Sequence, residues 1–126
     1  MFDLTDKVAL VTGASGGIGN AIARSLHAAG ASVALTGTRK EALDALAGEL
    51  GERAFVAPAN LSDPEAPAAL VETVEKGSGP IDILVNNAGL TRDMLSMRLS
   101  DEDWANVLDV NLGAAFRLSR AVLRGM

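Results

Sequence analysis

The sequence predicts an α/β domain built on a doubly wound parallel sheet. Short apolar runs alternate along the chain with segments in which apolar residues recur at helical spacing, which is the pattern of strands joined by helices. Glycine, proline and acidic residues stand between these segments at positions typical of helix ends. Parallel strands are covered on both faces by their connecting helices, and right-handed crossovers favour the strand order 3-2-1-4.

Four apolar runs are expected to form the strands, each followed by a helix. The first helix should end at Gly30 and the second at Gly51, because glycine suits the backbone beyond a helix C-terminus. The third should follow the capping sequence Ser62–Glu65 and end near Gly77. A single long helix, with acidic residues in its first turn, should begin after Ser100. The expected strands are Val8–Val11, Ser32–Leu35, Ala54–Ala57 and Ile81–Val85, the last of them an exposed edge.

Length and composition indicate one soluble globular domain. The chain has 126 residues, of which 48% are hydrophobic and 21% charged, and its formal net charge is -5. An acidic chain matches nucleic acid poorly, and no apolar stretch is long enough to span a bilayer. The lack of cysteine excludes disulfides and thiolate metal sites and agrees with a reducing compartment. We therefore expect a cytoplasmic protein with no metal, nucleic-acid partner or membrane association.

A glycine-rich segment, Thr12-Gly13-Ala14-Ser15-Gly16-Gly17-Ile18-Gly19, joins the first expected strand to the first expected helix. Glycine lets the backbone take positive φ angles and approach a diphosphate closely, and the helix N-terminus supplies unpaired N–H groups and positive potential. The spacing differs from G-x-G-x-x-G, and a tight turn without a ligand is the alternative interpretation. Its place between a strand and a helix favours dinucleotide binding, so the expected fold is of the Rossmann type.

A second motif, Asn86-Asn87-Ala88-Gly89, follows the fourth expected strand. Together with the glycine-rich segment it resembles the short-chain dehydrogenase/reductase family, and the resemblance covers essentially the whole chain. Residues 82–93 and 101–118 look most like the 3-oxoacyl-(acyl-carrier-protein) reductases of bacterial fatty-acid synthesis. The resemblance implies a nicotinamide cofactor, with residues 87–89 lying against the adenosine ribose.

The end of the second strand indicates which nicotinamide cofactor is bound. A carboxylate there usually holds a free ribose 2′-hydroxyl, but this chain has Thr38 and Arg39, with no acid before Glu41. A hydroxyl and a guanidinium suit a 2′-phosphate, so we expect NADP(H). Against this, Arg39 and Lys40 also suit a solvated helix start, and Gly16 stands where many NADP-linked relatives have a basic residue.

The third strand leads to the expected adenine contacts. Asn60 occupies the position where the family often has an aspartate facing the adenine, and Leu61 could pack on the ring. An Asx turn before Ser62 is the alternative role for Asn60. The complete set of expected cofactor contacts is Gly13, Ser15, Gly16, Gly17, Ile18, Gly19, Thr38, Arg39, Asn60, Leu61, Asn87, Ala88 and Gly89.

Asn111 lies on a largely apolar stripe of the last expected helix, between Trp104 and Ser119. A buried amide without a partner costs on the order of a few kcal/mol. Because Gly113 also weakens the helix, we expect a local break that holds a water; an asparagine satisfied by backbone is the alternative. The resemblance makes Asn111 a member of the family's Asn-Ser-Tyr-Lys catalytic group, whose Ser, Tyr and Lys have no counterparts in this chain.

These features predict an NADPH-dependent oxidoreductase that reduces 3-oxoacyl-(acyl-carrier-protein) to the 3-hydroxyacyl form. Hydride would pass to the keto carbon while the family's tyrosine protonates the oxygen. We expect residues 1–126 to be a single dinucleotide-binding domain, C-terminally incomplete and inactive alone. Reduction of another ketone or sugar is one alternative, and a non-catalytic nucleotide-binding module is the other.

Two kinds of partner are expected. Arg117, Arg120 and Arg124 share one helix face that could dock an acidic acyl carrier protein, although complementing the helix C-terminus or another subunit is the favoured explanation. The resemblance implies a homotetramer, and apolar residues on more than one side of the last helix support a homo-oligomer. Those residues are Ala114, Ala115, Leu118, Ala121 and Val122.

Overall fold

The computed structural model describes residues 3–61, 63–87, 100–108 and 112–125, with the backbone alone at 103, 104, 106 and 107. The described part contains a four-stranded parallel sheet in the order β3-β2-β1-β4, which confirms the predicted strand order. Every strand residue except Ser32 is apolar, as expected where helices cover both faces. The strands are β1 (Val8–Val11), β2 (Ser32–Leu35), β3 (Ala54–Val56) and β4 (Ile83–Val85).

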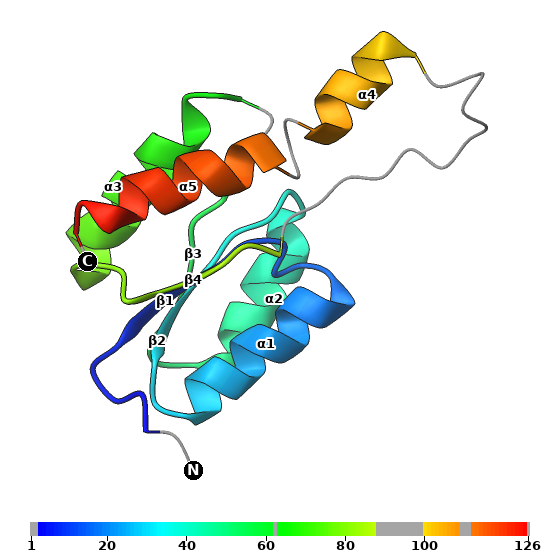
Figure 1. The fold of residues 1–126 in the computed structure, drawn as a ribbon. Coiled ribbons are helices and arrows are strands. Elements are labelled where there is room, and N and C mark those ends of the chain that lie inside the picture. Colours follow the sequence, from blue (N-terminus) through cyan, green and yellow to red (C-terminus); the bar gives the residue numbers. More distant parts are fainter. Residues whose placement is uncertain (1–2, 62, 88–99, 109–111, 126) are drawn as a thin grey trace.

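Helices lie on both faces of this sheet (Figure 1). One face is covered by α1 (Gly17–Ala28) and α2 (Lys40–Leu50), and the other by α3 (Ala66–Ser78) and α5 (Ala114–Leu123), which pack against each other. The helix α4 (Asp101–Leu108) precedes α5. No helix among the described residues is long and apolar enough to cross a membrane.

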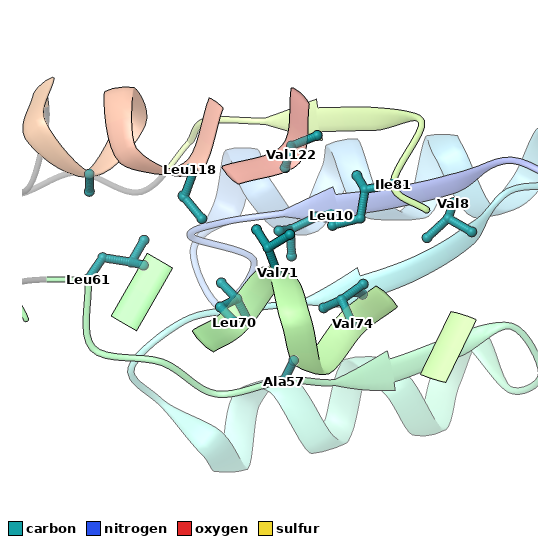
Figure 2. Packing of buried hydrophobic residues seen from close by; sticks show 12 residues of the cluster. Val8, Leu10, Ala57, Leu61, Leu70, Val71, Val74, Ile81, Leu118 and Val122 are labelled. Atoms are coloured by element: carbon teal, nitrogen blue, oxygen red, sulfur yellow. The ribbon is translucent and has the colours of Figure 1, made fainter. Parts of the chain in front are cut away.

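The central strand β1 contributes to two hydrophobic clusters, one on each face of the sheet. Val8 and Leu10 belong to the cluster beneath α3 and α5, whereas Ala9 and Val11 belong to the cluster beneath α1 and α2. This division follows from the two-residue period of a strand. Figure 2 shows the first cluster, in which apolar side chains from β1, α3 and α5 converge. The position of β1 is therefore held from both sides, and so is the loop that follows it.

β1 and β2 have the expected bounds, whereas β3 and β4 are slightly shorter than expected. β3 ends at Val56 and β4 begins at Ile83, although Ala57 N–H still donates to Leu35 O (2.9 Å) and Asp82 N–H to Val8 O (2.8 Å). Sheet hydrogen bonding thus continues past the strand ends. Glycines follow the first two helices as predicted, with positive φ angles at Gly30 (109°) and Gly51 (77°).

α3 begins at Ala66, directly after the predicted capping sequence, in which the Asp63 carboxylate accepts a hydrogen bond from Glu65 N–H (3.0 Å) in a local turn. The single long helix expected after Ser100 is wrong, because the structure has two helices, α4 and α5, but the local break expected near Gly113 is present. Leu112 and Gly113 form a wider, π-helical turn before α5, at the position where glycine weakens a regular helix.

The apolar residues of α5 are divided between the core and the surface. Ala114, Leu118 and Val122 are buried in the cluster with α3, so they offer no surface to another subunit, contrary to expectation. Periodicity alone could not tell which apolar side faces the sheet. The exposed apolar residues of this region are Leu112, Phe116 and Leu123.

Candidate cofactor site

The glycine-rich loop lies at the carboxyl end of β1, between the ends of β2 and β4. Two backbone hydrogen bonds hold it there: Ala14 N–H donates to Thr36 O (2.9 Å) beyond β2, and Thr12 N–H donates to Val85 O (3.1 Å) at the end of β4. In open α/β sheets, ligands bind outside the carboxyl ends of the strands. The loop therefore occupies the place where this fold forms a ligand site.

Gly13 and Gly19 allow the loop to pack directly on Asn87. Gly13 has a positive φ of 64°, and a Cβ there would lie 2.9 Å from both Asn87 Nδ2 and Asn87 O. A Cβ on Gly19 would overlap the Gly13 carbonyl oxygen and lie 2.7 Å from Asn87 Nδ2. The Asn87 amide also donates to Gly13 O (3.3 Å). The structure thus brings Asn87 into direct contact with the two glycines of the loop.

Thr12 connects the same two strand ends through its side chain. Its buried hydroxyl donates to Val85 O (3.1 Å) and accepts from Asn87 N–H (2.9 Å). Thr36 likewise connects the ends of β2 and β3, because its buried hydroxyl donates to Ala57 O (2.8 Å). Neither threonine was among the expected site residues. A hydroxyl at the carboxyl end of a buried strand is the signal that would have found both.

The first turn of α1 fits a diphosphate. Its N-cap is Gly16, which makes no side-chain capping bond, and the first N–H groups of a helix have no intrahelical partner. A Cβ at Gly17 would have nothing within 4 Å, so a ligand can come close to the backbone at this residue. The first turn holds no acidic residue that would repel an anion. Ile18 leaves 72% of its surface exposed beside this turn.

The end of β2 is in contact with the loop. The Arg39 guanidinium donates from Nη2 to Ser15 O (2.7 Å), and a Cβ on Gly37 would lie 2.9 Å from Ser15 Oγ. Thr38 and Arg39 are both exposed. Ser15 of the glycine-rich loop and Arg39, which was predicted to bind the 2′-phosphate, are therefore adjacent. Gly37, which was not among the expected site residues, leaves room for the Ser15 hydroxyl beside them.

The two expected adenine contacts differ in their surroundings. Asn60 is exposed, and its backbone carbonyl accepts from Asp63 N–H (3.1 Å), as in a turn. Leu61 is only 6% exposed and packs in the cluster beneath α3 and α5, so its side chain is committed to the core. The expected packing of this side chain on an adenine ring is therefore wrong. The expected sites Ala88, Gly89 and Asn111 lie outside the described residues.

The family is shown by comparison with known proteins. The model of the short chain dehydrogenase family matches residues 7–126. The chain belongs to the short-chain dehydrogenase/reductase family. Members of this family are oxidoreductases that bind nicotinamide cofactors.

Several relatives match the chain along its whole length. It is 57% identical over 126 residues to nodulation protein G of Rhizobium sp. (strain N33), covering 100% of this chain and 51% of that protein. It is 47% identical over 120 residues to 3-oxoacyl-(acyl-carrier-protein) reductase FabG of Escherichia coli (strain K12), and the match covers 95% of this chain and 49% of that protein. The chain thus spans about half the length of the curated relatives it matches.

A solved structure has the same fold. The short-chain dehydrogenase/reductase described as glucose/ribitol dehydrogenase, from Brucella melitensis, superposes with a TM-score of 0.94 at 35% identity, covering 99% of this chain and 54% of that one. This likeness agrees with the Rossmann-type sheet found here. Within the described residues, no three His, Cys, Asp or Glu side chains are grouped to hold a metal ion.

The packing of the loop predicts opposite effects for two neighbouring glycines. Gly19→Ala should lower the free energy of unfolding by about 1–3 kcal/mol, because its methyl group would overlap Gly13 O. Gly17→Ala is the matched control and should be neutral or raise stability by up to about 1 kcal/mol, since its methyl group meets nothing. Urea unfolding measures both values. Equal stabilities would contradict the close packing at Gly19.

Proposed function

We propose that the whole protein is an NADPH-dependent reductase that converts 3-oxoacyl-(acyl-carrier-protein) to the 3-hydroxyacyl form in fatty-acid synthesis. The observation that carries this proposal is the 47% identity to FabG relatives over 95–98% of the chain, including the complete glycine-rich loop. Because the chain spans about half of those relatives, the activity is assigned to the whole protein. We further propose that residues 1–126 form one dinucleotide-binding domain and that the enzyme is cytoplasmic, as the FabG resemblance supports.

The proposed cofactor is NADP(H), bound along the carboxyl ends of the strands. Its diphosphate would lie at Gly16 and Gly17 on the N-terminus of α1, and its 2′-phosphate at Thr38 and Arg39. Arg39 supports this choice because none of the ion pairs of the described residues includes it, so its charge has no carboxylate partner there. Asn60, the Leu61 backbone and residues 87–89 would complete the adenosine end.

The proposed chemistry divides between cofactor and protein. When bound, the cofactor supplies the hydride that reduces the keto carbon. The residues of this chain bind and orient it: the loop and α1 hold the diphosphate, and Asn87 keeps the loop in place. By the family resemblance, Asn111 would hold the water of the proton relay. The chain contains no tyrosine, so it does not itself provide the family's proton donor.

A groove between α3 and α5 is the proposed docking surface for the acyl carrier protein. Its α5 side carries Arg117, Arg120 and Arg124, and its α3 side carries Glu72, Glu75 and Lys76. The arginines would attract an acidic partner, while the two glutamates restrict how closely it can approach. Arg120 already lies over the Phe116 ring, 5.0 Å from its centre.

Two other functions remain to be distinguished. Reduction of another ketone or a sugar is favoured by the solved relative described as glucose/ribitol dehydrogenase. Two relatives more similar to this chain than the FabG relatives, at 57% and 53% identity, are nodulation protein G. A nucleotide-binding module without turnover is the third candidate, and it would bind the cofactor but reduce no substrate.

The cofactor assignment predicts tighter binding of NADPH than of NADH. Arg39→Asp should reverse the preference, because it replaces a cation by the carboxylate that suits a free 2′-hydroxyl and repels a 2′-phosphate. Dissociation constants for both cofactors, measured by calorimetry on the full-length protein and the variant, provide the test. Tighter binding of NADH by the unmutated protein would reject the assignment.

The reaction assignment predicts NADPH oxidation by the full-length protein with acetoacetyl thioesters, and none by residues 1–126 alone. Arg124→Glu should slow the acyl-carrier-protein substrate roughly threefold or more, with little effect on a small thioester, since one screened surface charge contributes about 0.5–1 kcal/mol. Turnover on sugars and not on thioesters would favour the alternative reductase. Comparable turnover by the 126-residue chain would require a proton donor other than tyrosine.

We also propose a homotetramer, in which the exposed face of α5 contacts another subunit. Leu112, Phe116 and Leu123 are 60–67% exposed and would be covered there. Phe116→Glu should therefore weaken assembly, because it would replace an apolar ring by a charged carboxylate in the buried contact. Analytical ultracentrifugation at micromolar concentration measures the assembly state. A monomer for the unmutated full-length protein would refute the proposal.

A further inference from the structure

Arg39 is placed to do more than discriminate between two cofactors. Its guanidinium bonds to the protein itself, donating to the Ser15 carbonyl at 2.7 Å across the gap between the end of β2 and the glycine-rich loop. Binding of a 2′-phosphate does not require this contact with the loop backbone. This bond therefore links the ribose end of the site to the part that faces the diphosphate.

The Ser15–Gly16 peptide is held at both of its polar groups. Arg39 binds its carbonyl oxygen, and its N–H, which belongs to Gly16, donates to Gly13 O (3.2 Å). The Gly13 carbonyl is in turn held by the Asn87 amide (3.3 Å). Because a peptide unit is planar, fixing both groups fixes its orientation. The conformation at the start of α1 thus depends on residues from the ends of β2 and β4 together.

The loop also packs closely against Gly37, through the side chain of Ser15. The Ser15 hydroxyl oxygen occupies the space that a side chain on Gly37 would take, at 2.9 Å from its Cβ position. The loop can therefore lie close enough to β2 for Arg39 to reach it. Lys40, the neighbouring cation, is instead paired with Asp44 on α2 (3.0 Å) and does not bind the loop.

We propose that Arg39 is a positioning residue for the glycine-rich loop, fixing the Ser15–Gly16 peptide so that the N-terminus of α1 is ready for the diphosphate of either nicotinamide cofactor. This inference rests on the proposed cofactor site and deepens it. A guanidinium has five N–H donors in a rigid fork, so one bond to Ser15 leaves others for a 2′-phosphate. Arg39 then contributes to NADH binding as well as NADPH binding.

The test compares Arg39→Met with Lys40→Met in the full-length protein. Both variants remove one exposed cation and keep an unbranched side chain, but only the first removes the bond to Ser15. Amide hydrogen exchange, measured by mass spectrometry without cofactor, should become at least about threefold faster in peptides covering residues 13–20 of Arg39→Met alone. Arg39→Lys should restore part of this protection, because its ammonium can donate one bond. Unchanged melting temperatures would show that the fold is retained.

Cofactor binding gives the second readout. Arg39→Met should raise the NADH dissociation constant roughly threefold to tenfold, the effect of one charged hydrogen bond, while Lys40→Met leaves it within about twofold. Unchanged loop exchange, or unchanged NADH affinity with only NADPH weakened, would overturn the positioning role and leave the cofactor assignment standing. If the unmutated protein binds neither cofactor, the proposed function fails, and the exchange result alone decides the role of Arg39.

Discussion

The carbonyl oxygen of Gly13 is the point where three segments of the chain meet. It accepts hydrogen bonds from Gly16 N–H and from the Asn87 side chain, and Gly19 of α1 packs directly on it. A side chain at Gly13 or Gly19 would separate the loop, the first turn of α1 and the end of β4. The glycine-rich loop can present its backbone to a ligand only because these segments are in contact without intervening side chains. The geometry of the site depends on this packing.

That contact is in turn fixed by the sheet. β1 is the central strand, paired in register with β2 on one side and β4 on the other, and both of its faces are buried. The loop leaves the end of β1 and is bound within a few residues to both neighbouring strand ends. Thr12 and Asn87 make the contacts on the β4 side, and Arg39 and Gly37 make those on the β2 side. The packing that stabilises the core around β1 therefore also holds the glycine-rich loop in position.

Local charge at the site differs from the charge of the whole chain. The formal net charge of the chain is -5. Next to the glycine-rich loop, however, lie the positive end of the α1 dipole and the Arg39 guanidinium, and the first turn of α1 holds no acidic residue. Exposed charges act over about a Debye length, roughly 8–10 Å at moderate salt, so distant carboxylates have little effect there. A net acidic protein can thus present a locally cationic surface to an anionic cofactor. The groove between α3 and α5 is a second instance, since its three arginines and Lys76 outnumber its two glutamates.

The sequence by itself determined the strand order, the element types and the position of the glycine-rich loop, because alternating apolar patterns and glycine spacing are local signals that the sheet must satisfy. It predicted a break near Gly113 but not that α4 and α5 are separate helices, since that depends on the wider turn formed by Leu112 and Gly113. It placed Asn87 and Arg39 at the site but could not say what they touch. Only the tertiary structure decided that Asn87 supports Gly13, that Leu61 is taken up by the core, and that Arg39 holds Ser15. The Arg39–Ser15 and Asn87–Gly13 bonds join residues 24 and 74 positions apart, and no local pattern specifies them.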